Sequence, residues 1–364
     1  MSLITLSRDT ELTPELIKKI VDTHKTSELP RLEKLKRYYE TKNDILNRQM
    51  ADSTKPNNKI ANAYASLITS TLVGYFVGEP ITYTADDKQM MDELQLLFEY
   101  NDEADENAEL AKNASIYGVA YELLYMEQQD EGMGRPMLRF HTLDTRECVP
   151  IYDDTIEHNL IAFIRYYTTK NVLNDTDLLV VELITDADTK RYEATVAGGL
   201  RLVETVPHYF GMVPVAIYKN NEELIGDFEP VISLIDAYDT MESDTVNDFD
   251  YFVDAYLALY GFTAEPEDIV KMKENRVLLM DEGTSAEWLI KNTDDTNVEN
   301  MKIRLDKDIH KFSHCPDMSD ENFAGNSSGV AIQYKLLGTE NLISIKERKF
   351  KRGLQQRLEL IAQM

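Results

Sequence analysis

The chain has 364 residues, of which 65 are Asp or Glu and 38 are Lys or Arg, so its formal net charge is −27. Hydrophobic residues make up 43% of the sequence, which is enough for a folded core and argues against intrinsic disorder. So acidic a protein is not expected to grip DNA by neutralising phosphates, because like charges repel at long range. If it meets DNA, we expect it to guide the duplex. The length suggests two or three domains.

No sorting or membrane signal is recognisable in the sequence. The first residues lack a basic region followed by a long apolar run, which argues against a signal peptide. The longest uncharged stretch, residues 60–78, contains Asn62 and Ser66 and is too polar for a membrane helix. Cys148 and Cys315 are too few for a disulfide framework and indicate a reducing compartment.

The first third of the chain has the periodicity of amphipathic helices. Thr13 followed by Pro14 predicts an N-cap and a first helical turn. Further helices follow from apolar residues at helical spacing, and Gly118 is suited to end the last of them. The expected elements are helices over residues 29–39 and 60–74, within 86–109 and over 107–117, with a short strand over 81–84.

Strand-like patterns replace the helical period after Ala120. Short runs separated by turn residues predict a meandering, mostly antiparallel sheet. Asp153 and Asp154 lie between two such runs, and we interpret them as a hairpin turn rather than as a catalytic carboxylate pair. The expected strands cover residues 121–126, 139–141, 148–152, 160–167, 178–185, 191–196 and 200–203, and residues 207–218 close the sheet.

A long acidic helix is predicted after the strands. Glu229 and Pro230 open it, and apolar residues at helical spacing extend it to about Phe262. Its roughly thirty residues would span about 50 Å at about 1.5 Å per residue. Apolar side chains on more than one of its sides indicate contacts with other chains.

The rest of the sequence predicts an insert, a returning helix, a loop and a final helix. The returning helix covers residues 298–312, with Met301, Leu305, Ile309 and Phe312 on one stripe, and Cys315-Pro316 stops it. The loop is rich in small residues, and the final helix, from Val330, becomes basic toward its end. Within the insert we expect a helix over residues 269–273 and strands over 276–280 and 286–290.

The sequence offers little for catalysis. His310 and His314 are four residues apart on the returning helix, with Asp306 nearby, and this spacing can hold a metal ion. Alternatively, the two histidines favour the negative end of a helix. Residues 325–329 could form a phosphate nest, but no P-loop lysine accompanies them. Since no nucleophile, base and orienting residue assemble, we expect no catalytic residues, no metal and no cofactor.

Four motifs, in this order along the chain, give the sequence a family resemblance. It resembles the portal proteins of tailed bacteriophages, most closely the siphophage portal family of phages that infect Gram-positive bacteria. The likeness covers essentially the whole chain. The motifs are Tyr75-Phe76-Val77-Gly78-Glu79-Pro80-Ile81, Ser115-Ile116-Tyr117-Gly118-Val119-Ala120-Tyr121, Pro150-Ile151-Tyr152-Asp153-Asp154 and Asn322-Phe323-Ala324-Gly325-Asn326-Ser327-Ser328-Gly329-Val330-Ala331.

The resemblance implies an α+β portal fold and a ring of about twelve subunits at one capsid vertex. Its central channel would pass double-stranded DNA during packaging and ejection, without sequence specificity. The implied partners are terminase, the major capsid or scaffolding protein and a head–tail adaptor, with no membrane. Assembly would take place in the host bacterial cytoplasm, and the ring would remain in the virion. A C-terminal helical crown is also implied, and this sequence ends before it.

The resemblance also divides the chain into regions and assigns site residues. Residues 1–228 would form the wing, 229–262 and 298–318 the two stem helices, 263–297 the clip, 319–329 the tunnel loop, and 330–364 a helix returning to the wing. The tunnel loop would place Ser319, Asp320, Glu321, Asn322, Phe323, Ala324, Gly325, Asn326, Ser327, Ser328 and Gly329 at the DNA channel. An acidic stem face would hold Asp236, Asp239, Asp244, Asp248, Asp250 and Asp254, and a clip interface Arg276 and Trp288.

A second hypothesis belongs to a different class of protein. An acidic metal-dependent hydrolase would use His310, His314 and Asp306 around a metal ion. A tightly bound transition metal with activity would favour this alternative, and a ring-shaped oligomer would favour the portal.

Overall fold

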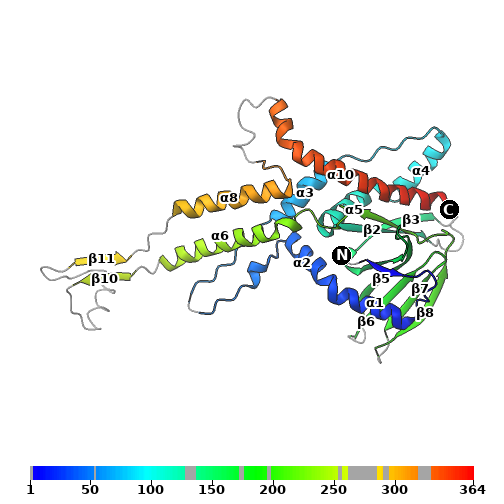
Figure 1. Ribbon diagram of the computed structural model, residues 1–364, viewed down its shortest axis with the longest axis horizontal. Coiled ribbons are helices and arrows are strands. Elements are labelled where there is room, and N and C mark those ends of the chain that lie inside the picture. Colours follow the sequence, from blue (N-terminus) through cyan, green and yellow to red (C-terminus); the bar gives the residue numbers. More distant parts are fainter. Residues whose placement is uncertain are drawn as a thin grey trace. The chain divides into compact units, whose positions relative to one another are not determined.

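The computed structural model in Figure 1 describes residues 3–52, 55–127, 137–171, 176–194, 198–252, 256–260, 285–289, 295–318 and 329–364. The chain forms two compact units. The first comprises Met1–Lys42, Ala63–Ser233 and Ile309–Met364, and the second comprises Asn43–Asn62 and Leu234–Asp308. Helices and mainly antiparallel strands occupy separate stretches of the chain, as expected for an α+β protein.

A six-stranded sheet lies in the first unit, with the order β1-β4-β5-β6-β7-β8. β1 (Ile4–Leu6) pairs in parallel with β4 (Cys148–Asp153), whereas the other neighbours are antiparallel. Helix α1 (Pro14–Ser27) contributes its apolar stripe to the core of this sheet. The remaining strands are β5 (Leu160–Asn171), β6 (Thr176–Ile184), β7 (Asp188–Ala194) and β8 (Leu200–Pro207).

The first unit also contains a three-stranded antiparallel sheet with the order β3-β2-β9. β2 (Val119–Glu127) is its central strand, between β3 (Met137–Leu143) and β9 (Val215–Lys219). Helices α5 (Glu103–Tyr117) and α10 (Gly329–Ala362) share a core with it. The buried members of that core include Leu110, Ala114, Leu124, Phe140, Phe210, Tyr218, Phe350 and Leu360.

Several predictions for the first unit are confirmed. The Thr13 hydroxyl accepts a hydrogen bond from the Leu16 N–H at 3.4 Å, and α1 begins at Pro14. α2 (Leu29–Tyr39) has the predicted bounds. Gly118 ends α5 with a φ of 90°, in the left-handed region that favours glycine. α3 (Tyr64–Val77) begins later than the predicted residue 60. α4 (Lys88–Tyr100) lies within residues 86–109, where a helix was expected.

Other predictions for this unit are wrong. Residues 81–84 form no strand, because Tyr83 packs its ring against Phe98 and donates its hydroxyl to Glu103. The short β1 was missed, and the strands form two sheets where we expected one. Local periodicity gives strand positions but does not tell which strands pair.

The second unit contains most of α6 (Ile232–Phe252), followed by β10 (Tyr256–Tyr260), β11 (Ser285–Leu289) and the first part of α8 (Asp295–Ser313). A short 3₁₀ turn over Glu229–Val231 precedes α6. The prediction that this helix continues to Phe262 is wrong, since β10 pairs antiparallel with β11. A short apolar run is compatible with either a helix or a strand, and here strand pairing decides.

The returning helix α8 matches its prediction only in part. Leu305 and Ile309 are buried, but Met301 and Phe312 from the same predicted stripe are each at least half exposed. No helix in the described part of the chain is both long and apolar enough to cross a membrane. The helix expected at 269–273 and the strand at 276–280 lie outside the described residues.

Candidate functional site

The predicted acidic face of α6 is only partly an exposed face. Asp239 is fully buried and accepts three hydrogen bonds. Its Oδ1 accepts from the backbone and side-chain nitrogens of Asn62, both at 2.9 Å, and its Oδ2 accepts from Asn43 Nδ2 at 2.6 Å. Burial raises the pKa of Asp239, although these hydrogen bonds oppose the rise. Placing Asp239 on an exposed acidic face is therefore wrong.

A polar segment of the second unit, residues 43–62, makes further bonds with α6 through its described residues, 43–52 and 55–62. Ser243 Oγ accepts from Ile60 N at 2.9 Å, and Asn247 Oδ1 accepts from Asn58 N at 2.7 Å. We call residues 43–62 the α6 strap. Most of its bonds to the helix are neutral hydrogen bonds from asparagine side chains and the backbone, and Arg48 adds one ion pair. The sequence analysis gave no sign of this pairing.

The other predicted carboxylates of α6 are more accessible. Asp244 is exposed and forms an ion pair with Arg48 at 2.7 Å. Asp250 is exposed and accepts from Asn58 Nδ2 at 2.5 Å. Asp236 and Asp248 are partly buried, and Asp254 lies outside the described residues. Four of the six predicted positions are thus at least partly accessible, and one of these four, Asp244, is paired with a cation.

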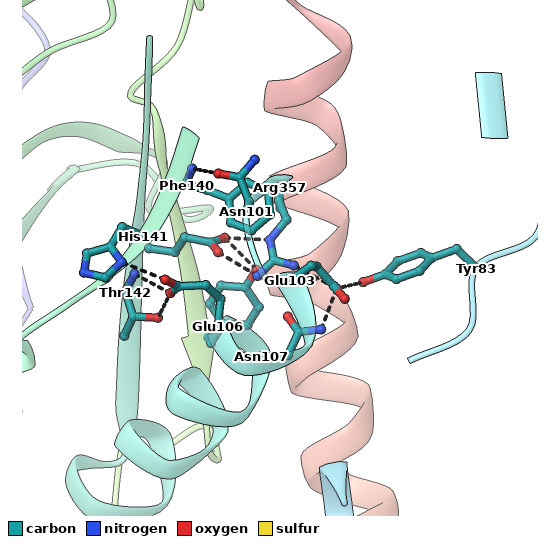
Figure 2. A network of polar contacts seen from close by, with 11 residues as sticks. Tyr83, Asn101, Glu103, Glu106, Asn107, Phe140, His141, Thr142 and Arg357 are labelled. Carbon is teal, nitrogen blue, oxygen red and sulfur yellow. Dashed lines mark hydrogen bonds and ion pairs between the residues drawn. The ribbon is translucent and has the colours of Figure 1, made fainter. Parts of the chain in front are cut away.

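The C-terminal helix α10 carries a buried ionic network, shown in Figure 2. Arg357 is fully buried, and it donates to both oxygens of Glu122 on β2, at 2.8 and 2.6 Å. Its Nη1 reaches Glu103 Oε1 on α5 at 3.1 Å. Glu103 also accepts from the hydroxyl of Tyr83 and from Asn107, each at 2.5 Å.

This network joins three elements through one guanidinium. Burial opposes the charge of Arg357, but Glu122, Tyr218 and Glu103 outweigh it and raise the pKa of the guanidinium. The guanidinium carbon lies 4.6 Å from the centre of the Phe140 ring, which adds a cation–π contact. Removal of one partner from a buried pair leaves an uncompensated charge and is strongly destabilising. The network therefore fixes α10 against β2 and α5.

Neighbouring contacts in Figure 2 fix the start of α5 to β3. Glu106 accepts from the backbone N–H and the hydroxyl of Thr142, at 2.8 and 2.7 Å, and lies 2.6 Å from His141 Nδ1. Asn101 accepts from the backbone N–H of Phe140 at 3.1 Å. The acidic residues at the start of α5, Glu103 and Glu106, thus accept hydrogen bonds from other parts of the protein instead of only binding water.

A second ionic anchor lies further toward the start of α10. Lys346 Nζ and Asp227 Oδ2 are 2.5 Å apart, with side chains 4% and 2% exposed. Asp227 also accepts from Ser115 Oγ at 2.6 Å and from Asn220 Nδ2 at 2.8 Å. Since Asp227 lies shortly before α6 in sequence, this cluster fixes the segment that leads into that helix.

The same segment has a further clamp. Arg31 on α2 donates to both carboxylate oxygens of Glu229, at 2.7 and 2.6 Å, and to the carbonyl of Leu224 at 2.9 Å. Gly226 is needed here, since a Cβ would lie 2.3 Å from the carbonyl oxygen of Ile116. Sequence reasoning missed these pairs because their partners are 193 or more residues apart.

The remaining predicted site residues give less information. Ser319–Ser328 of the loop, and Arg276, lie outside the described residues, while Gly329 is the first residue of α10. Trp288 belongs to β11, where its backbone is opposite Leu257.

The metal hypothesis gains no support. His310 Nδ1 lies 3.2 Å from the carbonyl of Cys315, and His314 adopts a φ of 55° after the end of α8. Over the part of the chain that the structure describes, no three His, Cys, Asp or Glu side chains are grouped to hold a metal ion.

Comparison with known proteins supports the portal hypothesis. A family model described as "Phage portal protein, SPP1 Gp6-like" matches residues 18–364. The chain belongs to this family of phage portal proteins. The portal protein of Bacillus phage SPP1 is 26% identical over 367 residues, which span 93% of this chain and 70% of that protein. The portal protein of Clostridium phage phiCD119 is 25% identical over 350 residues, which span 90% of this chain and 77% of the relative.

A solved structure also resembles this portal chain. A chain from the virion of a native gene transfer agent particle aligns with a TM-score of 0.47 at 10% identity, over 90% of this chain and 81% of that one. The resemblance found in the sequence is confirmed by the family and its phage relatives: the chain is a phage portal protein of the virion. The family is structural rather than enzymatic.

Proposed function

We propose that copies of this portal protein close into a ring of about twelve at one capsid vertex, around a channel for double-stranded DNA. A contact that joins copies head to tail produces a ring when its rotation closes. Exposed apolar side chains on the helices support such contacts, among them Phe249 on α6, which is 61% exposed, and Tyr334 on α10, which is 75% exposed.

The observation that carries the channel proposal is the exposed acidic character of α6. Asp250 is exposed and bonded to the neutral Asn58, and Asp244 is exposed next to Arg48, on a chain whose net charge is −27. When repeated around a ring, these carboxylates give the channel a negative wall. Such a wall repels DNA phosphates and so limits adhesion while the duplex moves.

We assign regions of the chain from its membership of the phage portal family. Residues 1–228 form the wing, 229–262 the first stem segment, 263–297 the clip and 298–318 the second stem helix. Residues 319–329 form the tunnel loop that meets DNA, and 330–364 return to the wing. In this assignment α6 gives the stem its acidic face, and Arg276 and Trp288 belong to the clip interface.

The portal itself performs no chemistry in this proposal. DNA translocation is driven by a separate terminase that docks on the ring, and a head–tail adaptor and the capsid or scaffolding protein are the other partners. Assembly takes place in the cytoplasm of the host bacterium. We expect the purified protein to hydrolyse no ATP and cleave no DNA. Magnesium-dependent ATP hydrolysis that disappears on mutation of Asp306 or His310 would contradict this.

The ring is tested by negative-stain electron microscopy and light scattering of the purified full-length protein. We expect closed rings, and a protein that stays monomeric at micromolar concentration would overturn the proposal. The variant Asp244→Lys/Asp250→Lys should still form rings. These rings should package DNA more slowly, because the new lysines in the channel wall attract DNA phosphates. The variant Asp154→Lys/Glu157→Lys changes the net charge equally at exposed positions outside α6 and is the matched control.

A further inference from the structure

A cavity of about 290 Å³ lies in the first unit, and none of its lining residues belongs to α6. Its lining comes from β1, the end of α1, β2, β4, β9 and the turn after β9. The apolar part of the wall includes Val119, Val149 and Ile217. This volume is near the lower end of small-molecule sites, which are roughly 300–1,000 Å³.

A buried polar atom without a hydrogen-bond partner belongs to a residue that lines this cavity. His24 is 3% exposed, and its Nε2 is without a partner. Tyr121 and Tyr152 also line the cavity, and Tyr121 is only 1% exposed. Buried polar groups are normally paired, so an unpaired nitrogen on the lining of a cavity requires an explanation.

The hydrogen bonds of His24 determine what its free nitrogen can do. Tyr166 donates its hydroxyl proton to the backbone carbonyl of Arg146, at 3.2 Å. The same hydroxyl oxygen lies 2.8 Å from His24 Nδ1, and since its only proton is directed to Arg146, we assign the His24 tautomer that carries its proton on Nδ1. This assignment leaves Nε2 with a lone pair. A partner for Nε2 must therefore donate a hydrogen bond.

The cavity has no uncompensated charge. Glu28 is paired with Arg31 at 2.6 Å, and Lys219 lies 3.6 Å from Glu222. Burial, against the influence of Glu28, lowers the pKa of His24 and keeps the imidazole neutral. A charged ligand would lose its hydration here without gaining an opposite charge, which is costly.

We propose that this cavity binds a small neutral molecule with an apolar body and a hydroxyl or amine that donates a hydrogen bond to His24 Nε2. The apolar body packs against Val119, Val149 and Ile217, and the hydroxyls of Tyr121 and Tyr152 bind further polar atoms of the ligand. Ligand binding is measured on the purified protein without DNA packaging, so its test does not depend on the proposed portal mechanism.

Phenol is a suitable probe, because it combines a ring with one hydroxyl donor. We expect saturable binding to the purified full-length protein by NMR titration, with a dissociation constant of about 1 mM, as expected for a weak fragment. Anisole, which has no donor, should bind at least about 5-fold more weakly, as expected for a hydrogen bond of roughly 1 kcal/mol. A crystal structure with phenol should place its hydroxyl within hydrogen-bond distance of His24 Nε2.

Two variants separate the site from general adhesion to the protein. Val149→Phe fills the cavity and should abolish phenol binding, whereas Tyr121→Phe removes one hydroxyl without changing the shape and should weaken it. Tyr192→Phe, at a buried tyrosine that does not line the cavity, is the matched control and should bind like the parent. Thermal unfolding checks that each variant is folded. The proposal is overturned if phenol does not saturate, if anisole binds equally well, or if a folded Val149→Phe variant binds phenol normally. It is also overturned if the crystal shows ordered water alone in the cavity after soaking with phenol.

Discussion

Helices α6 and α10 are both long and charged, but they use their charges in opposite ways. On α10, two cations, Lys346 and Arg357, are buried against carboxylates of distant elements. On α6, the one fully buried carboxylate, Asp239, is held by asparagines of the α6 strap, with no cation bound to it. Ionic anchors fix α10 in a rigid position, whereas most bonds from the α6 strap to α6 are neutral hydrogen bonds, with one exposed ion pair between Arg48 and Asp244.

The two arrangements should also differ in the free energy lost when a contact is broken. Breaking a buried ion pair leaves a charge in a low-dielectric site, and breaking a neutral hydrogen bond leaves only an unpaired dipole. The following changes test that difference, beginning with the largest expected effect.

Arg357→Met should lower the free energy of unfolding by about 3–5 kcal/mol, because Glu122 and Glu103 remain buried without their cation. Chemical denaturation measures the loss. Adding Glu122→Leu should restore part of it, since an apolar pair of similar size has no charge to compensate. Glu347→Gln, an exposed change on the same helix, should stay within about 0.5 kcal/mol of the parent. Equal losses for Arg357→Met and Glu347→Gln would refute the ionic anchor.

Gly353→Ala tests how closely α10 packs on β9. A Cβ at this position would lie 2.4 Å from the Tyr218 ring, so the substitution should cost about 1–3 kcal/mol through overpacking. Gly338→Ala on the same helix is the control, because its nearest atom would be an ordinary 3.6 Å away. At residue 338 the higher helix propensity of alanine should raise the free energy of unfolding by about 0.5–1 kcal/mol. If Gly338→Ala lowered the free energy of unfolding and Gly353→Ala left it unchanged, α10 would not pack on Tyr218 as closely as described.

Asp239→Asn should release the α6 strap without unfolding the first unit. The new amide places a donor where Asn43 and Asn62 also donate, which costs about 1–3 kcal/mol. Hydrogen exchange should increase over residues 43–62 and remain unchanged in β5 and β6. Asp244→Asn, at an exposed carboxylate, should have an effect of less than about 1 kcal/mol. Faster exchange in both units alike would mean that the strap is not a separate element.

Acidification should weaken the first unit through His24. Burial lowers the pKa of His24 below its ordinary value of 6.5, so the unfolded chain binds the proton more readily. The stability that neutral His24 contributes is present above pH 6.5 and is lost as the pH falls toward the pKa of the folded state. Between pH 7.5 and 5.5 the parent should therefore lose more stability than His24→Gln in denaturation experiments. An equal loss in both proteins would show that His24 does not titrate in this way.

Asp239 should respond to acid in the opposite direction. Burial raises its pKa, so the folded state binds the proton more readily than the unfolded chain and this contribution to stability grows as the pH falls. The contributions of His24 and Asp239 to stability should thus change in opposite directions as the pH falls.

The sequence by itself determined where most elements lie and which family the chain belongs to. Thr13 with Pro14 located α1, Gly118 located the end of α5, and ordered motifs indicated a portal protein. These features depend on neighbouring residues: a cap, a left-handed glycine and a helical period are local properties of the backbone.

Only the tertiary structure decided which charges are buried and which strands pair. Nothing local to Arg357 or Asp239 distinguishes them from the exposed charges around them, and their partners are 235 and 196 residues away. Likewise, Tyr256–Tyr260 fits either a helix or a strand, and its pairing with β11 makes it a strand. A charged side chain or a short apolar run takes its role from what packs against it, and that is set by contacts between distant parts of the chain.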